Sequence, residues 1–90
     1  MARFKDFRIH QDVYDLVGRF PVEVQRCLLT AFHKIEAGKA DLLPDAILQH
    51  LHATQYCDYT ILVSITKSGD IAVVVDLVAE RNHMSRIPGD

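Results

Sequence analysis

The densest group of side chains able to do chemistry is the run Glu80-Arg81-Asn82-His83. A histidine titrates near neutral pH and can move a proton, while an arginine guanidinium can hold an oxyanion. The run therefore predicts an acid/base pair in which Arg81 and His83 are the catalytic candidates. The alternative is a solvated strand end, where Glu80 and Arg81 form a surface ion pair worth well under about 1 kcal/mol.

A second group supplies atoms of the kind that bind zinc, namely His50, His52, Cys57 and His83. Two histidines spaced two apart reach one metal only from a strand, and the residues before them have a helical pattern. We therefore expect neither a metal site nor a cofactor. The sequence also lacks a Gly-rich phosphate loop, a recognisable Ser/His/Asp order and a paired-cysteine motif.

Composition narrows the function classes. The chain has 90 residues, 49% of them hydrophobic, and a formal net charge of -2, which disfavours general binding to a phosphate backbone. We expect one domain spanning residues 1–90. The N-terminal residues do not resemble a signal peptide and no apolar run is long enough to span a bilayer, so we expect a cytoplasmic protein. In that reducing compartment Cys27 and Cys57 are expected to be buried free thiols.

The elements that would position these groups begin with an edge strand over Arg3 to Ile9, where charged residues blunt the exposed side. Gln11 to Val17 has the spacing of a short helix. The strongest pattern is a helix that Pro21 opens and Gly38 ends. Its apolar stripe recurs at three- and four-residue steps, through Val24, Cys27, Leu28, Ala31 and Ile35, and is widened by Leu29 and Phe32.

The second half is predicted to be rich in β-structure. Residues 41–51 fit either a short third helix opened by Pro44 or an irregular connection, and residues 52–55 are expected to form a loop. Residues 59–66 and 71–78 then predict a hairpin. Both rows of its second strand are apolar except at Asp76, which predicts an inner strand with its second face covered by a helix or a second subunit. We expect Asp76 to be partly buried and to need a partner.

These elements define an α+β fold class. One N-terminal strand and two helices, with a short third helix as the alternative, are followed by a C-terminal antiparallel hairpin. The hairpin is expected to complete a small sheet that packs against the helices.

Four segments also carry motifs of one known family. They are Arg3-Phe4-Lys5-Asp6-Phe7, residues 20–25 with Ile35-Glu36-Ala37-Gly38, Asp58-Tyr59-Thr60-Ile61-Leu62, and residues 74–81. In sequence and in order these segments resemble the RelE/ParE superfamily of small bacterial toxins. The resemblance implies membership of a toxin-antitoxin system and neutralisation by an antitoxin segment that wraps the helices and the sheet.

The departures from that family concern its ribonuclease members. Thr60 stands where they have an arginine after Asp-Tyr, and residues 51–55 replace a strand with alternating lysine or arginine. Their terminal tyrosine or histidine has no clear counterpart among residues 84–87. Arg81 alone matches a family arginine, which implies that it would stabilise a scissile phosphate.

We therefore expect a toxin-like component that acts mainly by binding a protein, with an antitoxin-like partner and without enzymatic activity. The resemblance suggests the second helix as the partner-binding surface, through Val24, Leu28, Leu29 and Phe32. One alternative is a divergent ribosome-dependent mRNA interferase, an endoribonuclease using Arg81, His83 and His52. Another is a non-toxic homodimeric regulatory or structural module. Nucleic acid is expected to be reached only through the ribosome, and no membrane is involved.

Overall fold

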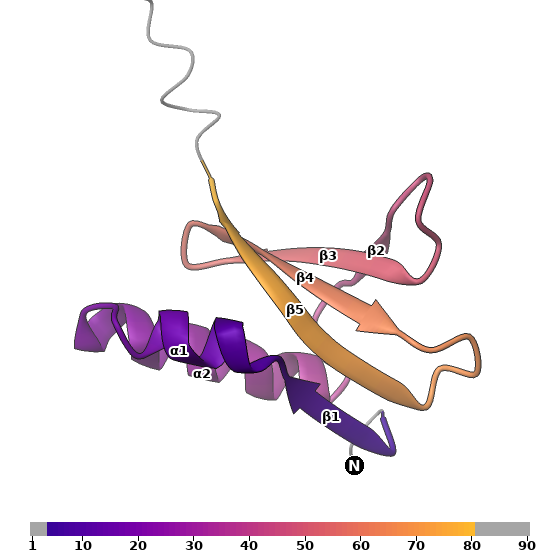
Figure 1. Ribbon diagram of the computed structural model, residues 1–90, viewed down its shortest axis with the longest axis horizontal. Coiled ribbons are helices and arrows are strands. Elements are labelled where there is room, and N and C mark those ends of the chain that lie inside the picture. The colour runs from indigo at the N-terminus through magenta and orange to yellow at the C-terminus, as the bar shows by residue number, and fades with distance from the viewer. Residues whose placement is uncertain (1–3, 81–90) are drawn as a thin grey trace, which may run out of the picture.

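The computed structural model describes residues 4–80, in which one sheet packs against two helices (Figure 1). Strand β1 (Asp6–Ile9) is followed by helices α1 (Gln11–Val17) and α2 (Val22–Glu36). Strands β2 (Leu43–Pro44), β3 (Leu51–Tyr56), β4 (Tyr59–Ile65) and β5 (Ile71–Ala79) complete the chain order. The predicted α+β class is confirmed, although the sheet is larger than expected.

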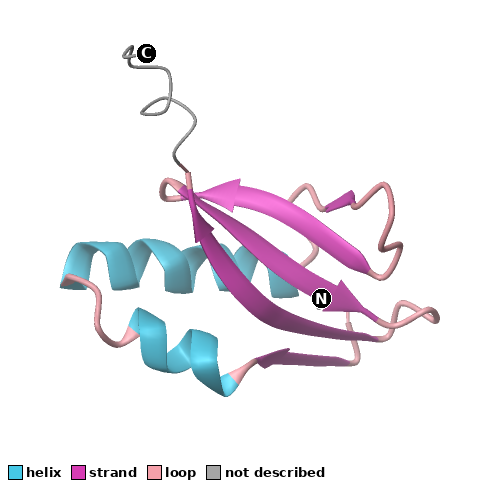
Figure 2. Ribbon diagram, turned by 45° about the horizontal axis from the view of Figure 1, so that its top comes forward, coloured by secondary structure: helices cyan, strands magenta, loops and turns pink. Residues whose placement is uncertain are grey.

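The sheet has five strands in the order β1-β5-β4-β3-β2. Strand β1 runs parallel to β5, and the other neighbouring pairs are antiparallel. The predicted edge position of the first strand and the inner position of β5 are both confirmed. Figure 2 shows the helices together on one side of this sheet.

Helix α2 ends as the sequence predicts. Gly38 has a φ of 76°, the left-handed conformation that glycine adopts without a steric penalty. The N–H of Gly38 donates to the carbonyl of Ile35, and the N–H of Lys39 donates to the carbonyl of Lys34. These two bonds form a Schellman motif, which satisfies carbonyls that the helix itself leaves unpaired. At the other end Pro21 is the N-cap residue rather than the first helical residue.

Both helices and the sheet share one hydrophobic core. Helix α2 contributes its apolar stripe, helix α1 contributes Val13 and Val17, and the sheet contributes alternate residues of β4 and β5. The least exposed large side chains are Leu28, Ile35, Ile61, Val63 and Val74. Because the core lies between the helices and one face of the sheet, it does not involve the other face.

Strand β3 occupies the residues that were expected to form a loop. It pairs with β4 from Leu51 to Tyr56, and the two strands join through a turn at Cys57 and Asp58, whose φ values are 59° and 67°. Two consecutive positive φ angles are those of a type I′ turn, which matches the twist of a hairpin. Neither residue is glycine, so the usual sequence signal was missing. Residues 41–50 contain the short strand β2 and no helix.

A β-bulge changes which side chains of β5 face the core. Val63 pairs with Val74, but the preceding residue Leu62 pairs with Asp76, so Val75 is an extra residue. Up to Val74 the side chains of β5 alternate regularly between the two faces of the sheet. Beyond Val74 this alternation is shifted by one residue. Regular alternation from Ile71 would place Leu77 on the same face as Val73 and Val75, but the bulge instead buries Leu77 and leaves Asp76 exposed.

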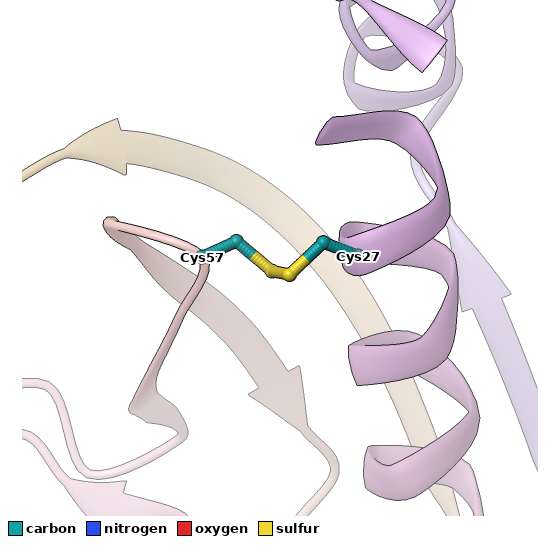
Figure 3. Close-up of a disulfide and its surroundings, with 2 residues drawn as sticks. All are labelled: Cys27 and Cys57. Atoms are coloured by element: carbon teal, nitrogen blue, oxygen red, sulfur yellow. A yellow bond between two sulfur atoms is a disulfide. The ribbon is translucent and has the colours of Figure 1, made fainter. Parts of the chain in front are cut away.

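A disulfide joins helix α2 to the β3–β4 turn (Figure 3). Cys27 and Cys57 are bonded, with their Cα atoms 6.1 Å apart and a sequence separation of 30. Cys27 is exposed and Cys57 is half-buried. The expectation of two buried free thiols is therefore wrong. No local pattern indicates the pairing, because the two cysteines become neighbours only when α2 packs beside the hairpin.

Candidate functional site

One face of the sheet is not covered by any element of residues 4–80. We call it the open face. The strand register places three rows of side chains on it. These rows are Leu51, Ser64, Val73 and Arg8; then Leu43, Ala53, Leu62 and Asp76; then Gln55, Thr60 and Val78. Several are apolar and all are at least partly exposed, so the predicted cover over the second face of β5 is absent from the described residues.

The charges on the open face are mainly negative. Among residues 4–80 the one guanidinium on this face, that of Arg8, donates from Nε to Asp6 Oδ2 at 2.7 Å, and Asp6 lies on the same face of β1. Asp76 is exposed farther along the sheet. At the third row the carboxylate of Glu80 accepts hydrogen bonds from Thr60 Oγ1 and from Gln55 Nε2. Strands β3, β4 and β5 contain neither lysine nor arginine.

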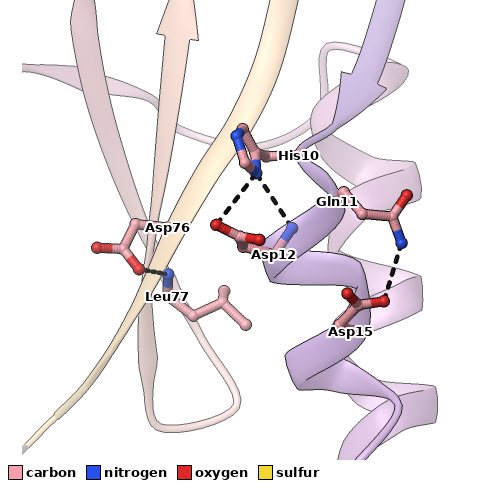
Figure 4. Close-up of polar contacts among 6 residues, drawn as sticks. All are labelled: His10, Gln11, Asp12, Asp15, Asp76 and Leu77. Carbon is pink, nitrogen blue, oxygen red and sulfur yellow. Dashed lines mark hydrogen bonds and ion pairs between the residues drawn. The ribbon is translucent and has the colours of Figure 1, made fainter.

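The surroundings of Asp76 correct the expectation that it is partly buried. In Figure 4 the side chains of Asp76 and Leu77 lie on opposite sides of β5, with Leu77 directed toward α1. Asp76 Oδ1 accepts a hydrogen bond of 2.8 Å from the backbone N–H of Leu77. The carboxylate therefore has a local partner and needs no buried cation.

A groove of about 530 Å³ lies between α1 and β5, lined by residues that include Asp12, Asp15, Arg19 and Asp76. Asp15 accepts a hydrogen bond from Gln11 Nε2 at 2.8 Å, and His10 Nδ1 accepts one from the Asp12 N–H at 3.1 Å. Both bonds are drawn in Figure 4. His10 thus caps helix α1, a role that sequence inspection missed. These bonds stabilise the first turn of the helix. None of them orients a side chain that could act as a nucleophile.

The four residues expected to bind a partner differ in how exposed their side chains are. Leu28 is 0% exposed and Phe32 is 3% exposed, because both side chains point from α2 into the core. Val24 is half-buried and packs against that core. Leu29, at 41% exposed, is the one whose side chain is available at the surface. The interpretation of Leu28 and Phe32 as surface contacts is therefore corrected, since the wide apolar stripe serves the core.

The catalytic candidates Arg81 and His83 lie outside the described residues, so their roles stay predictions. His52 lies on strand β3 and faces the helix side of the sheet, opposite to the Glu80 carboxylate. Its Nδ1 is buried and has no hydrogen-bond partner within residues 4–80. Cys57 is held in the disulfide and has no thiolate to offer a metal. In the part of the chain that the structure describes, no three His, Cys, Asp or Glu side chains form a metal-binding group.

The loop after β2 is ordered by an aspartate. Asp45 Oδ2 accepts hydrogen bonds from the backbone N–H groups of Leu48 and Ile47, at 2.8 and 2.9 Å. These bonds, first that from Leu48, favour the ionised carboxyl and lower the pKa of Asp45 below its usual value. The loop carries the exposed side chains of Ile47 and Leu48.

We predict that this loop loosens in acid. Because the folded-state pKa of Asp45 is lowered, its stabilising contribution is present above the unfolded-state pKa and is lost as the pH falls through the folded-state value. An NMR titration should give a midpoint for Asp45 below that of an unfolded peptide, and the Ile47 and Leu48 amides should lose protection at the same pH. In an Asp45→Ala control they should be unprotected at every pH. A midpoint at or above the peptide value would contradict the prediction.

Comparison with solved structures gives the same fold. A chain of the archaeal RelE-RelB complex from Pyrococcus horikoshii superposes with a TM-score of 0.66, over 89% of this chain and 98% of that chain. The sequence identity is 16%, so the likeness concerns the fold. The protein therefore has a RelE-like fold, and the resemblance to the RelE/ParE superfamily is confirmed at that level.

The other comparisons and the search for membrane spans add no assignment. No protein-family model matches the sequence, and no curated protein matches it. Among residues 4–80, no helix has the length and apolar character needed to cross a membrane.

Proposed function

We propose that this protein is the toxin-like component of a toxin-antitoxin pair and acts mainly by binding a protein. The neighbouring structure supports the first part, because it is a complex of two proteins, RelE and RelB. By analogy of fold, we propose an antitoxin-like protein as the first partner of this chain, in the cytoplasm. Fold alone does not fix function, so the second part depends on the open face.

The observation that carries the proposal is the absence of cations from strands β3, β4 and β5. A protein that binds RNA neutralises phosphates with lysine or arginine, and this term supplies most of the non-specific affinity. On the described open face the one guanidinium, from Arg8, is already paired with Asp6. Apolar side chains such as Leu62 and Val78 are instead suited to a protein surface.

The test is induced expression of the chain with and without the products of its neighbouring genes. We expect growth arrest that one of those products relieves, and a complex of the two proteins on gel filtration. Harmless expression with no complex would overturn the proposal.

A cleavage assay on translating ribosomes separates protein binding from the alternative of an mRNA interferase. We expect no cleavage by the wild-type chain. Cleavage that Arg81→Ala and His83→Ala abolish would establish the ribonuclease instead.

A further inference from the structure

The open face has the dimensions of a helix-binding surface. Strands β3, β4 and β5 lie side by side at spacings of about 4.8 Å, so their faces together form a strip about as wide as an α-helix. An added strand would pair at a sheet edge, whereas a helix packs on a face. The strip carries apolar side chains along its length, including Leu51, Leu62, Val73 and Val78.

The carboxylates define the charge that an occupant must carry. Asp6 is neutralised by Arg8, which leaves Asp76 and Glu80 as the uncompensated charges of the described face. Both bonds to Glu80 reach Oε2, so Oε1 has no hydrogen-bond donor among residues 4–80. Thr60 and Gln55 hold this carboxylate in place, which reduces the entropy lost when it meets a cation.

We infer that the open face binds a cationic amphipathic helix of the partner protein, with its lysine or arginine side chains paired to Asp76 and Glu80. The inference rests on the proposed function and adds the chemistry of the partner. Asp76 and Glu80 are four residues apart along a strand, which separates them by about 13 Å. That distance corresponds to about two and a half turns of a helix lying along β5.

Electrostatics argues against the other occupants. A second copy that used the same face would bring a second set of Asp76 and Glu80 carboxylates into the interface, and like charges there disfavour association. RNA would bring phosphates toward the same carboxylates. An acidic helix is disfavoured for the same reason, so a basic polypeptide is the complementary occupant.

The experiment uses two synthetic amphipathic helices of about 18 residues, identical in their apolar residues, with lysine or glutamate at the polar positions. Binding to the full chain is measured by calorimetry at about 0.05 M and about 0.5 M salt. We expect the lysine peptide to bind at least about ten times more tightly than the glutamate peptide at low salt, with a smaller difference at high salt.

Paired variants locate the site. Asp76→Asn with Glu80→Gln should weaken binding of the lysine peptide about tenfold, since two exposed ion pairs are lost and each contributes modestly. The control is Glu23→Gln with Glu36→Gln, which removes two carboxylates from helix α2 on the other side of the sheet and should leave affinity unchanged. Val78→Ser should weaken binding of both peptides.

Several results would overturn the inference. These are equal affinity for both peptides, no binding of the lysine peptide at millimolar concentration, or loss of binding in the helix α2 control alone. If the wild-type chain forms a dimer and Val78→Ser disrupts it, the face is a binding surface for a second copy of the chain. If a neighbouring gene product binds the chain and the Asp76 and Glu80 variants leave that complex unchanged, the inference fails while the proposed function stands.

Discussion

Reduction of the Cys27–Cys57 disulfide should lower the free energy of unfolding by about 3 to 4 kcal/mol. The bond closes a loop across 30 residues of sequence. In the chain-entropy description, a crosslink of that span removes conformations from the unfolded state worth about this much. A domain of this size has a total stability of about 5 to 13 kcal/mol, so the disulfide is a large part of it.

The measurement is urea unfolding with and without a reductant. Cys27→Ser with Cys57→Ser provides the control, since its stability should match that of the reduced protein and should not respond to the reductant. The exposed position of Cys27 gives a reductant access to the bond. Equal stability of the oxidised and reduced chains would contradict the prediction and would mean that the other contacts at this junction suffice.

Beside the shared core, two aromatic contacts lie near this junction. Phe20 stacks on Tyr59 with ring centroids 5.3 Å apart, and Lys34 Nζ lies 5.6 Å from the centroid of the Tyr56 ring. Each such contact contributes about 0.5 to 1.5 kcal/mol, less than the crosslink. In a reducing environment the junction of α2 with the hairpin would depend on these contacts and on the shared core, so the stability of the protein would follow the redox conditions.

The second large effect is expected at adjacent residues of helix α2. Leu28→Ala should cost about 3 to 5 kcal/mol, because Leu28 is 0% exposed and its removal leaves a cavity between the helix and the sheet. Leu29→Ala should cost less than about 1 kcal/mol, since Leu29 is 41% exposed. Urea unfolding of the two variants measures both values.

This pair also tests the corrected view of the partner surface. Helix propensity is nearly the same in both variants, so the difference reports burial. If Leu29→Ala weakens a complex with the partner while the fold is unchanged, helix α2 contributes to binding through its exposed side. Similar losses of stability in the two variants would contradict the assignment of Leu28 to the core.

The local patterns of the sequence predicted several elements well. Helix α1 has the predicted bounds of Gln11 and Val17, and helix α2 ends at the glycine expected to end it. The hairpin of β4 and β5 was also predicted. These features depend on residues close together in the chain, on helical spacing, on the left-handed tolerance of glycine and on β-branched runs.

Strand β3 shows why other elements could not be predicted from the sequence. Its residues, Leu51 to Tyr56, have little β-branched character, and they become a strand because β4 offers six paired positions alongside. The bulge at Val75 had no local signal either, yet it decides that Asp76 reaches the open face and that Leu77 enters the core.

The sequence by itself determined the α+β class, the two helices and the final hairpin, because short-range spacing and capping specify them. Only the tertiary structure decided that Cys27 meets Cys57, that Leu28 and Phe32 are core residues, and that Asp76 and Glu80 share the open face. Those outcomes depend on strand register and on the packing of α2 against the sheet. They join residues far apart in sequence, which local patterns do not relate.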